Sequence, residues 1–379
     1  MRAVIHIGTP KTGTTTIQSF LDRNRQSLKK QGVFIPAAGI QYFSRSRLSA
    51  ATCLIDARES CPLFHGHFQN GCVRRGFLSL YKKYFTAADQ EKQKQKCRRE
   101  IEKFCRKDGL AIFSNENFSL FIDNEVERLK ELLNPLFDDV MVVIYLRRQP
   151  ECLVSLHPTI VWNGTSWSIL DYLNVPEERS LLAYHPIVKR WSIFGKNKVK
   201  VRIFDKKAFH ENDLLSDFAA TAGFDLTGLV RVKNRKEAKL GSAEVEFMRS
   251  LNSHIPVMIG PFMNNPDHSK QVRKFLEDYA LNNPGDSKKA YHFSRAEAGR
   301  ILEQFREGND WIAREFLGQE HLFDDDLSMY SEEVVSGHQL THEKWGEITA
   351  YVLREMRKRQ VSYWFRSLRV WMQQKITKH

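Results

Sequence analysis

The chain has 379 residues, of which 42% are hydrophobic and 27% are charged. This balance is typical of globular proteins and excludes an intrinsically disordered chain. Lysine and arginine number 58 against 45 aspartates and glutamates, which gives a formal net charge of +13. A positive excess of this size favours an anionic partner, such as a nucleotide, an acidic glycan, a nucleic acid or a membrane surface.

The sequence also bears on the cellular compartment. Six cysteines are spread thinly through the chain, which does not resemble the compact disulfide framework of a small secreted domain. The residues from Met1 to Gly8 enter a strand-like run at once and lack the charged, apolar and cleavage regions of a signal peptide. The sequence has no run of about 18 or more apolar residues that could span a bilayer. We therefore expect a soluble cytoplasmic protein.

The N-terminal region has the pattern of a strand, a tight loop and a helix. Residues 3–7 form a short apolar run rich in β-branched side chains, which predicts a buried strand that ends at Gly8. Apolar side chains recur at helical spacing from Ile17 to Leu28, which predicts a helix over residues 13–30. This order is typical of the opening of a parallel α/β domain.

Further strands and helices alternate along the chain. Each predicted strand is apolar throughout, which indicates a parallel sheet covered by helices on both faces. We therefore predict an α/β fold with a doubly wound, P-loop-like parallel sheet flanked by helices. The remaining strands are expected at 110–113, 140–146 and 199–204, and helices at 124–136, 151–162, 242–253, 295–317 and from 343 to the end.

Three regions follow from these patterns. Residues 1–240 are expected to form the α/β core, with residues 37–108 as a helical insertion. Beyond this core the strand patterns stop, and residues 241–340 are expected to be a helical region packed on the core. Residues 341–379 carry nine Lys or Arg and three Glu among several aromatic residues, which predicts a basic amphipathic helix. Such a helix can pack on the domain, dock a partner or make the protein peripheral at the inner membrane.

The loop from Gly8 to Thr16 lies between the first strand and the first helix. At such a junction, backbone N–H groups and the positive helix end attract phosphate, and glycines at 8 and 13 permit a tight turn and close approach of an anion. The two glycines have Walker A spacing, but Thr14 stands where that motif has its lysine, and Lys11 lies inside the loop. The loop can therefore grip a 5′-phosphate, but it lacks the usual apparatus for a metal-bridged triphosphate.

The stretch from Pro10 to Thr15 resembles the 5′-phosphosulfate loop of the sulfotransferase family, whose pattern is P-K-[ST]-G-T-[ST]. The family's second signature is an arginine at the end of a strand and a serine eight residues later at the start of a helix. Arg147 and Ser155 match it. A guanidinium grips phosphate through two parallel hydrogen bonds, and a serine near the helix start adds a hydroxyl.

This resemblance covers about residues 1–235 and 294–323, where the chain looks like bacterial sulfotransferases of glycans. It implies that 3′-phosphoadenosine 5′-phosphosulfate is the sulfuryl donor and that a hydroxyl of a carbohydrate or glycolipid is the acceptor. The 3′-phosphate of the donor would be held by Arg147 and Ser155. Its 5′ end would be held by Pro10, Lys11, Thr12, Gly13, Thr14, Thr15 and Thr16. Neither a metal nor a nucleic acid is expected.

Sulfuryl transfer needs in-line geometry and stabilisation of charge on the departing oxygen. The resemblance assigns that stabilisation to Lys11. The acceptor hydroxyl also needs a base within hydrogen-bond reach, and Glu116, just past a predicted strand, is the candidate. Its alternative role is that of a capping or loop carboxylate. His65, His67 and His157 are candidates for acceptor contacts, and the first two are also rival bases.

Two other interpretations remain open. A P-loop kinase or NTPase would use the strand that ends in Asp205 as a Walker B motif, although the Walker lysine is missing and Asp205 is as easily a capping residue. A non-catalytic protein would use its positive charge to bind an anionic ligand. A zinc site between Cys53 and Cys72 is not expected, because the spacing of cysteine and histidine there matches none of the usual ligand patterns.

Overall fold

The computed structural model divides the chain into two compact units. The first contains Met1–His157, Ile169–Arg235 and Phe293–Glu332, and the second contains Pro158–Ser168, Lys236–His292 and Glu333–His379. Within them the structure describes residues 1–36, 95, 99–100, 102–103, 108–162, 164–177, 180–231, 240–254, 258–259, 263–264, 270–283, 293–332 and 340–358. Nearly all of the expected helical insertion at 37–108 therefore lies outside the described residues. The region expected at 241–340 is divided, because part of it belongs to the first unit.

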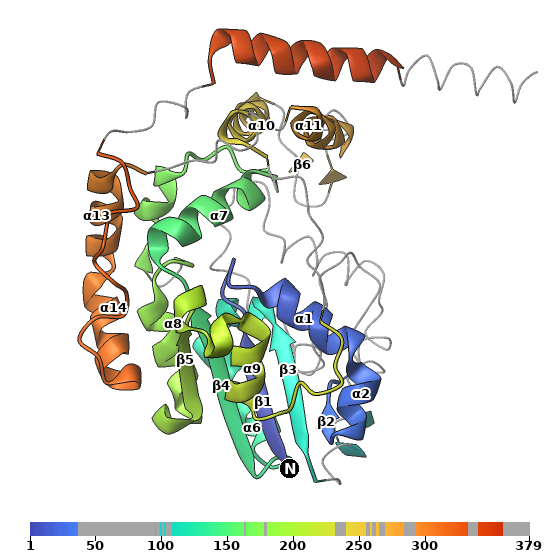
Figure 1. Ribbon diagram of the computed structural model, residues 1–379, viewed down its shortest axis with the longest axis vertical. Coiled ribbons are helices and arrows are strands. Elements are labelled where there is room, and N and C mark those ends of the chain that lie inside the picture. Colours follow the sequence, from blue (N-terminus) through green and yellow to red (C-terminus); the bar gives the residue numbers. More distant parts are fainter. Residues whose placement is uncertain are drawn as a thin grey trace, which may run out of the picture. The chain divides into compact units, whose positions relative to one another are not determined.

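The first unit is built on a five-stranded sheet in which every pair of neighbouring strands is parallel (Figure 1). The order across the sheet is β2-β3-β1-β4-β5. The predicted parallel α/β fold and its four expected strands are confirmed. The short strand β2 was not predicted, because two residues show no periodicity. The strands are β1 (Arg2–Ile7), β2 (Val33–Phe34), β3 (Leu110–Asn115), β4 (Asp139–Leu146) and β5 (Val199–Ile203).

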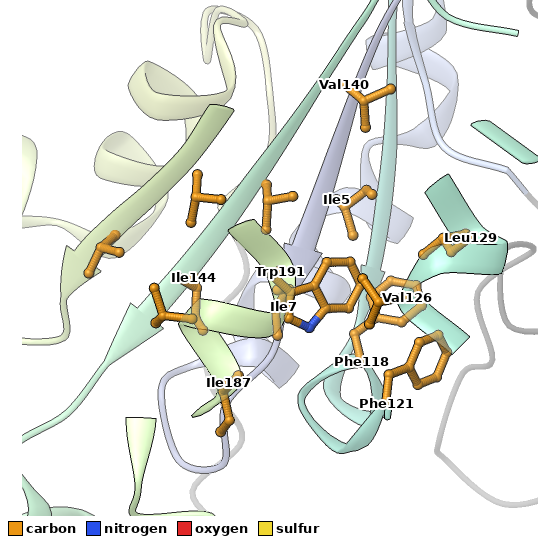
Figure 2. Close-up of a cluster of buried hydrophobic side chains, with 14 of the residues drawn as sticks. Ile5, Ile7, Phe118, Phe121, Val126, Leu129, Val140, Ile144, Ile187 and Trp191 are labelled. Carbon is orange, nitrogen blue, oxygen red and sulfur yellow. The ribbon is translucent and has the colours of Figure 1, made fainter. Parts of the chain in front are cut away.

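Helices cover both faces of this sheet. One face packs against α1 (Thr14–Arg23) and α9 (Leu214–Ala222), and the other packs against α6 (Asp123–Leu133) and α8 (Tyr184–Trp191). Figure 2 shows the second cluster, in which Trp191 lies among side chains of β1 and the segment that follows β3. Burial of each large apolar side chain contributes about 1.5–3 kcal/mol, so the buried apolar residues of the strands stabilise the centre of the fold.

The remaining helical segments of the first unit follow or connect these elements. The longest is α7 (Gln149–Trp162), which begins two residues after Arg147 and whose last residues belong to the second unit. The helix expected at 295–317 is divided into α13 (Arg295–Gln304), α14 (Arg306–Ile312) and a π-helical turn, η9 (Ala313–Leu317). The other segments are α2 (Arg25–Lys30) and the 3-10 turns η2 (Glu116–Leu120), η3 (Leu170–Asn174), η5 (Ser192–Phe194), η6 (Lys196–Lys198), η7 (Lys206–Ala208) and η8 (His210–Asn212).

The single helix predicted over residues 13–30 is interrupted at Asn24, which separates α1 from α2. The Asn24 side chain donates to the Phe20 carbonyl and to the Val230 carbonyl, both at 2.9 Å, and accepts from the Val230 N–H at 2.7 Å. A buried side-chain amide with these partners competes with the backbone ladder of a helix. The prediction of one continuous helix was wrong because the partner of Asn24 is distant in the sequence.

The second unit is mainly helical and has its own apolar core. Its helices are α10 (Ser242–His254), α11 (Lys270–Asn282) and a helix over residues 342–358. Two short antiparallel strands, β6 (Met258–Ile259) and β7 (Met263–Asn264), lie between α10 and α11 in the sequence. The expectation that strands stop beyond residue 240 was therefore wrong, because a pair of two-residue strands gives no recognisable pattern.

The described part of the basic C-terminal region packs within the second unit. Ile348 and Val352 are buried in the core of this unit, and the rings of Trp345 and Phe247 have centroids 4.6 Å apart. Residues 359–379 lie outside the described residues, so contact with a membrane surface stays a prediction. Among the described helices, none is long and apolar enough to cross a membrane.

A histidine is buried in the central strand of the first unit. His6 lies in β1 with Nδ1 2.8 Å from Ser114 Oγ, and its ring lies against the rings of Tyr145 and Phe218. Burial lowers the pKa of His6 from 6.5 to about 3. The folded protein therefore keeps His6 neutral at a pH where the unfolded chain binds a proton.

This difference predicts a pH dependence of stability. Between pH 6.5 and about 3 only the unfolded state takes up the proton at His6, so the free energy of unfolding falls as the pH falls through this window. The loss is about 1.4 kcal/mol for each pH unit, or about 2 kcal/mol at pH 5. Denaturant unfolding of the wild type and of His6→Gln at about pH 7.5 and 5 measures it. The account is contradicted if both proteins lose the same stability on acidification.

Candidate functional site

The strand order predicts where a ligand binds. From β1 the chain passes to β2 at one edge of the sheet, and from β4 it passes to β5 at the other edge. Loops that leave neighbouring strands in opposite directions open a crevice at their carboxyl ends, where open α/β sheets bind ligands. The register pairs Ile7 of β1 with Ile144 of β4. The loop that begins at Gly8 and the arginine at Arg147 therefore leave the sheet beside each other.

The loop after β1 is braced from within and from β4. The Thr12 hydroxyl donates to the Thr9 carbonyl at 2.7 Å, and the Thr9 hydroxyl donates to the Tyr145 carbonyl in β4. Thr9 and Thr12 are fully buried. Thr12 was predicted to contact the sulfuryl donor. Its hydroxyl instead donates a hydrogen bond to the backbone of the loop. Its side chain therefore sets the shape of the loop.

Glycine is needed where the loop approaches its neighbours. A Cβ at Gly8 would lie 2.6 Å from side-chain atoms of Thr14 and 2.8 Å from the Cα of Glu116. Gly13 begins α1 in the left-handed conformation, with φ of 75°. Lys11 also has a positive φ, of 63°. A non-glycine residue in this region costs of the order of 1–3 kcal/mol, and such residues cluster at functional sites.

The N-terminus of α1 has the properties of an anion site. No side chain among the described residues caps it, and its first turn carries no acidic residue. The first-turn N–H groups of a helix have no partner within the helix, and they form its positive end. Thr14, in the same turn, is 3% exposed, and its Oγ1 is buried without a hydrogen-bond partner among the described residues. A buried hydroxyl at a helix start suits an external anion as its partner.

Arg147 from the second predicted motif lies against this loop. Its Nη1 donates to the Lys11 carbonyl at 3.3 Å, and its guanidinium lies 5.6 Å from the centroid of the Phe204 ring. Phe204 follows β5, and its ring also lies beside Gly13. The carboxyl ends of β1, β4 and β5 thus contribute to one site.

Two buried side chains from α8 and α7 support the two loops. The Tyr184 hydroxyl donates to the Arg147 carbonyl at 2.5 Å. The Cys152 thiol lies 3.7 Å from the Pro10 carbonyl, and burial raises the pKa of this thiol, so it stays protonated and able to donate. Ser155 is half-buried and lies three residues after Cys152, on the same side of α7. It therefore lies one turn along from a residue that contacts the loop, and its contact with a 3′-phosphate stays a prediction.

Glu116 lies at the edge of the site where β3 ends. It is the first residue of η2, and its backbone approaches Gly8. The residue is solvent-exposed, but the surrounding protein partly desolvates its carboxyl group. This desolvation raises the pKa of Glu116, and the positive charge of Lys11 acts in the opposite direction. Lys11 is therefore close enough for its positive charge to act on the Glu116 carboxyl group.

The remaining predicted residues have different outcomes. Thr15 is exposed and Thr16 is half-buried on α1. His157 is 6% exposed, and its ring lies 6.1 Å from that of Tyr172, centroid to centroid. The Asp205 carboxylate accepts from the Lys207 N–H at 2.8 Å and caps η7, which is the capping role left open for it. His65, His67 and the cluster from Cys53 to Cys72 lie outside the described residues.

Two residues at the site, Phe204 and Tyr184, were not predicted from the sequence. One feature of the sequence could have indicated Phe204, namely its place at the end of a predicted strand of a parallel sheet. Tyr184 had no such feature, because it lies 37 residues after Arg147 at the start of another helix. Its contact with Arg147 depends on how α8 packs under the sheet, and no local pattern encodes that packing.

The chain has weak similarity to known proteins. No family model matches it. An uncharacterized protein of Archaeoglobus fulgidus is 27% identical over 216 residues, which are 56% of this chain and 55% of that protein. The match therefore spans about half the length of that relative. Among solved structures, a sulfotransferase from Alicyclobacillus acidocaldarius has a TM-score of 0.39 and 17% identity, over 62% of this chain and 85% of that chain. Neither similarity is high enough to assign the chain to a family.

Proposed function

We propose that the chain is a sulfotransferase that uses 3′-phosphoadenosine 5′-phosphosulfate and transfers its sulfuryl group to a hydroxyl of a carbohydrate or glycolipid. One observation carries the proposal: the Arg147 guanidinium donates to the Lys11 carbonyl at 3.3 Å. Two motifs that are far apart in the sequence therefore meet at one end of the sheet. Two anion-binding groups in this arrangement suit a nucleotide that carries phosphate at both its 5′ and its 3′ end.

The residues at the site fit this donor at both ends. At the 5′ end, the uncapped start of α1 and the buried, unpartnered hydroxyl of Thr14 offer hydrogen-bond donors to an anion. Lys11 adds a positive charge there. At the 3′ end, Arg147 and Ser155 supply a guanidinium and a hydroxyl. A Cβ at Gly8 would clash with Thr14 and Glu116, so glycine lets the loop pack closely against the start of α1 and the end of β3.

The chemistry follows from the charges of these residues. The bound donor supplies the sulfuryl group, whose bond to the 5′-phosphate oxygen breaks as the bond to the acceptor oxygen forms. Lys11 neutralises the charge that develops on the departing phosphate oxygen. Glu116 accepts the proton of the acceptor hydroxyl and becomes a neutral carboxylic acid. The loop and Arg147 hold the reactants in line.

The kinase or NTPase alternative has less support at this site. Thr14 occupies the position of the Walker lysine, and the Asp205 carboxylate is engaged in capping η7. A site for a metal-bridged triphosphate would need both functions. The carbohydrate acceptor is proposed from the resemblance to bacterial glycan sulfotransferases, and the net charge of +13 suits an acidic glycan.

Removal of the Lys11 charge is expected to abolish transfer without unfolding the protein. Because the ammonium group stabilises charge on the departing oxygen, Lys11→Ala should lower the transfer rate by about 100-fold or more. The measurement is transfer of radiolabelled sulfate from the donor to a panel of polysaccharides, with circular dichroism to check the fold. Lys30→Ala, at an exposed lysine near the end of α2, is the control. Transfer that survives Lys11→Ala at the control rate would contradict the proposal.

Glu116 is expected to set the acid limb of the pH profile. A base works only when it is ionised, so kcat/KM should fall as the pH drops through a pKa above the ordinary Glu value of 4.5, because desolvation raises the pKa of Glu116. Glu116→Gln should lose about 100-fold in kcat/KM at neutral pH. Glu127→Gln, at an exposed position in α6, is the control. If Glu116→Gln keeps the wild-type rate, Glu116 is only a loop carboxylate.

A further inference from the structure

The last segment of the first unit reaches the start of α7, beside the proposed 3′-phosphate site. Tyr330 is buried, and its hydroxyl donates to Glu151 Oε1 at 2.6 Å. Arg148 Nη1 lies 3.6 Å from the same oxygen, and Arg148 Nη2 donates to the Asp326 carbonyl at 2.8 Å. Burial, together with the hydrogen bond to Glu151, raises the pKa of Tyr330. The phenol therefore stays protonated and acts as the donor.

Glu151 lies near Tyr330 together with Arg147, because the charges of both act on the Tyr330 hydroxyl. Glu151 lies in the first turn of α7, four residues after Arg147 in the sequence. A carboxylate paired with Arg147 would cancel the charge that a 3′-phosphate requires, because opposite charges a few ångströms apart attract strongly where water is partly excluded. Instead, Oε1 of Glu151 is bound by Tyr330, and its Oε2 is buried without a hydrogen-bond partner among the described residues.

The two adjacent arginines have different partners among the described residues. Arg147 contacts the loop through the Lys11 carbonyl. Arg148 contacts Glu151 and lies 6.0 Å from the centroid of the Tyr330 ring. Tyr330, which also contacts Glu151, lies 179 residues further along the chain than Glu151.

We propose that Tyr330 and Arg148 hold Glu151 away from Arg147 and so keep the Arg147 charge available to the 3′-phosphate of the donor. Tyr330 is then a positioning residue that acts through Glu151. This inference rests on the proposed function. It adds that selectivity for the 3′-phosphate of the donor depends on the segment from Phe293 to Glu332. This segment follows all five strands of the sheet in the sequence.

The test compares two ligands that differ only in the 3′-phosphate, namely 3′-phosphoadenosine 5′-phosphate and adenosine 5′-monophosphate. Calorimetric titration of the full chain measures both affinities. In Tyr330→Phe the freed carboxylate can pair with Arg147, so affinity for the bisphosphate should fall about five- to tenfold. Affinity for the monophosphate should stay within about twofold, because the 5′ end is untouched.

A second variant separates this role from a purely structural one. In the double variant Tyr330→Phe, Glu151→Gln, the competing charge is gone, so the preference for the bisphosphate should return to that of Glu151→Gln alone. If Tyr330 only fastens its segment to α7, the double variant should bind as weakly as Tyr330→Phe. That result would overturn the inference.

The outcomes also separate the inference from the proposed function. If the wild type binds the bisphosphate no more tightly than the monophosphate, the 3′-phosphate site fails, and the inference fails with it. If the wild type prefers the bisphosphate and Tyr330→Phe keeps that preference, only the inference fails. Should circular dichroism show that Tyr330→Phe does not fold, Arg148→Gln releases the same carboxylate. It should show the same selective loss and the same rescue by Glu151→Gln, and an unchanged preference would again overturn the inference.

Discussion

The parallel pairing of β1 with β4 is the constraint on which the candidate site depends. Because Ile7 lies opposite Ile144, the two loops that follow these strands leave the sheet together. Hydrogen bonds then fasten one loop to the other: the Thr9 hydroxyl donates to the backbone of β4, and Arg147 donates to the Lys11 carbonyl. The buried strands supply the rigid base, and these few polar contacts determine the spacing of the two anion-binding groups.

The carboxylates of Glu116 and Glu151, near the two loops, have different surroundings. Glu116 is desolvated, which raises its pKa, and Lys11 partly offsets the effect. A carboxylate whose pKa is raised takes up a proton more readily than an ordinary one, which suits a base. Glu151 is instead bound by Tyr330 and lies close to Arg148. In the proposed sulfotransferase, the first carboxylate acts on the acceptor, whereas the second is kept from neutralising the donor site.

The sequence predicted those features whose cause is local. Apolar runs predicted β1, β3 and β4, apolar residues interrupted by Lys200 and Arg202 predicted β5, and the glycine-lysine-threonine loop predicted the start of α1. The interruption at Asn24 was missed because its partner, Val230, lies 206 residues away. The contacts of Tyr184 and Tyr330 were missed for the same reason, since each depends on packing between distant segments. The pair β6 and β7 was too short to leave a pattern. Pairing of the loop with Arg147 was predicted from the resemblance of the two motifs to those of sulfotransferases, and it depends on the strand order that the structure describes.

The central claim is that one metal-free nucleotide with phosphate at both ends joins the loop and Arg147. Calorimetric titration of the wild-type chain with 3′-phosphoadenosine 5′-phosphate in the presence of EDTA, and with ATP and Mg²⁺ in a parallel experiment, tests it most directly. The account predicts binding of one bisphosphate per chain without metal, and much weaker binding of ATP with Mg²⁺. Tight binding of ATP with Mg²⁺ together with no measurable binding of the bisphosphate would contradict it.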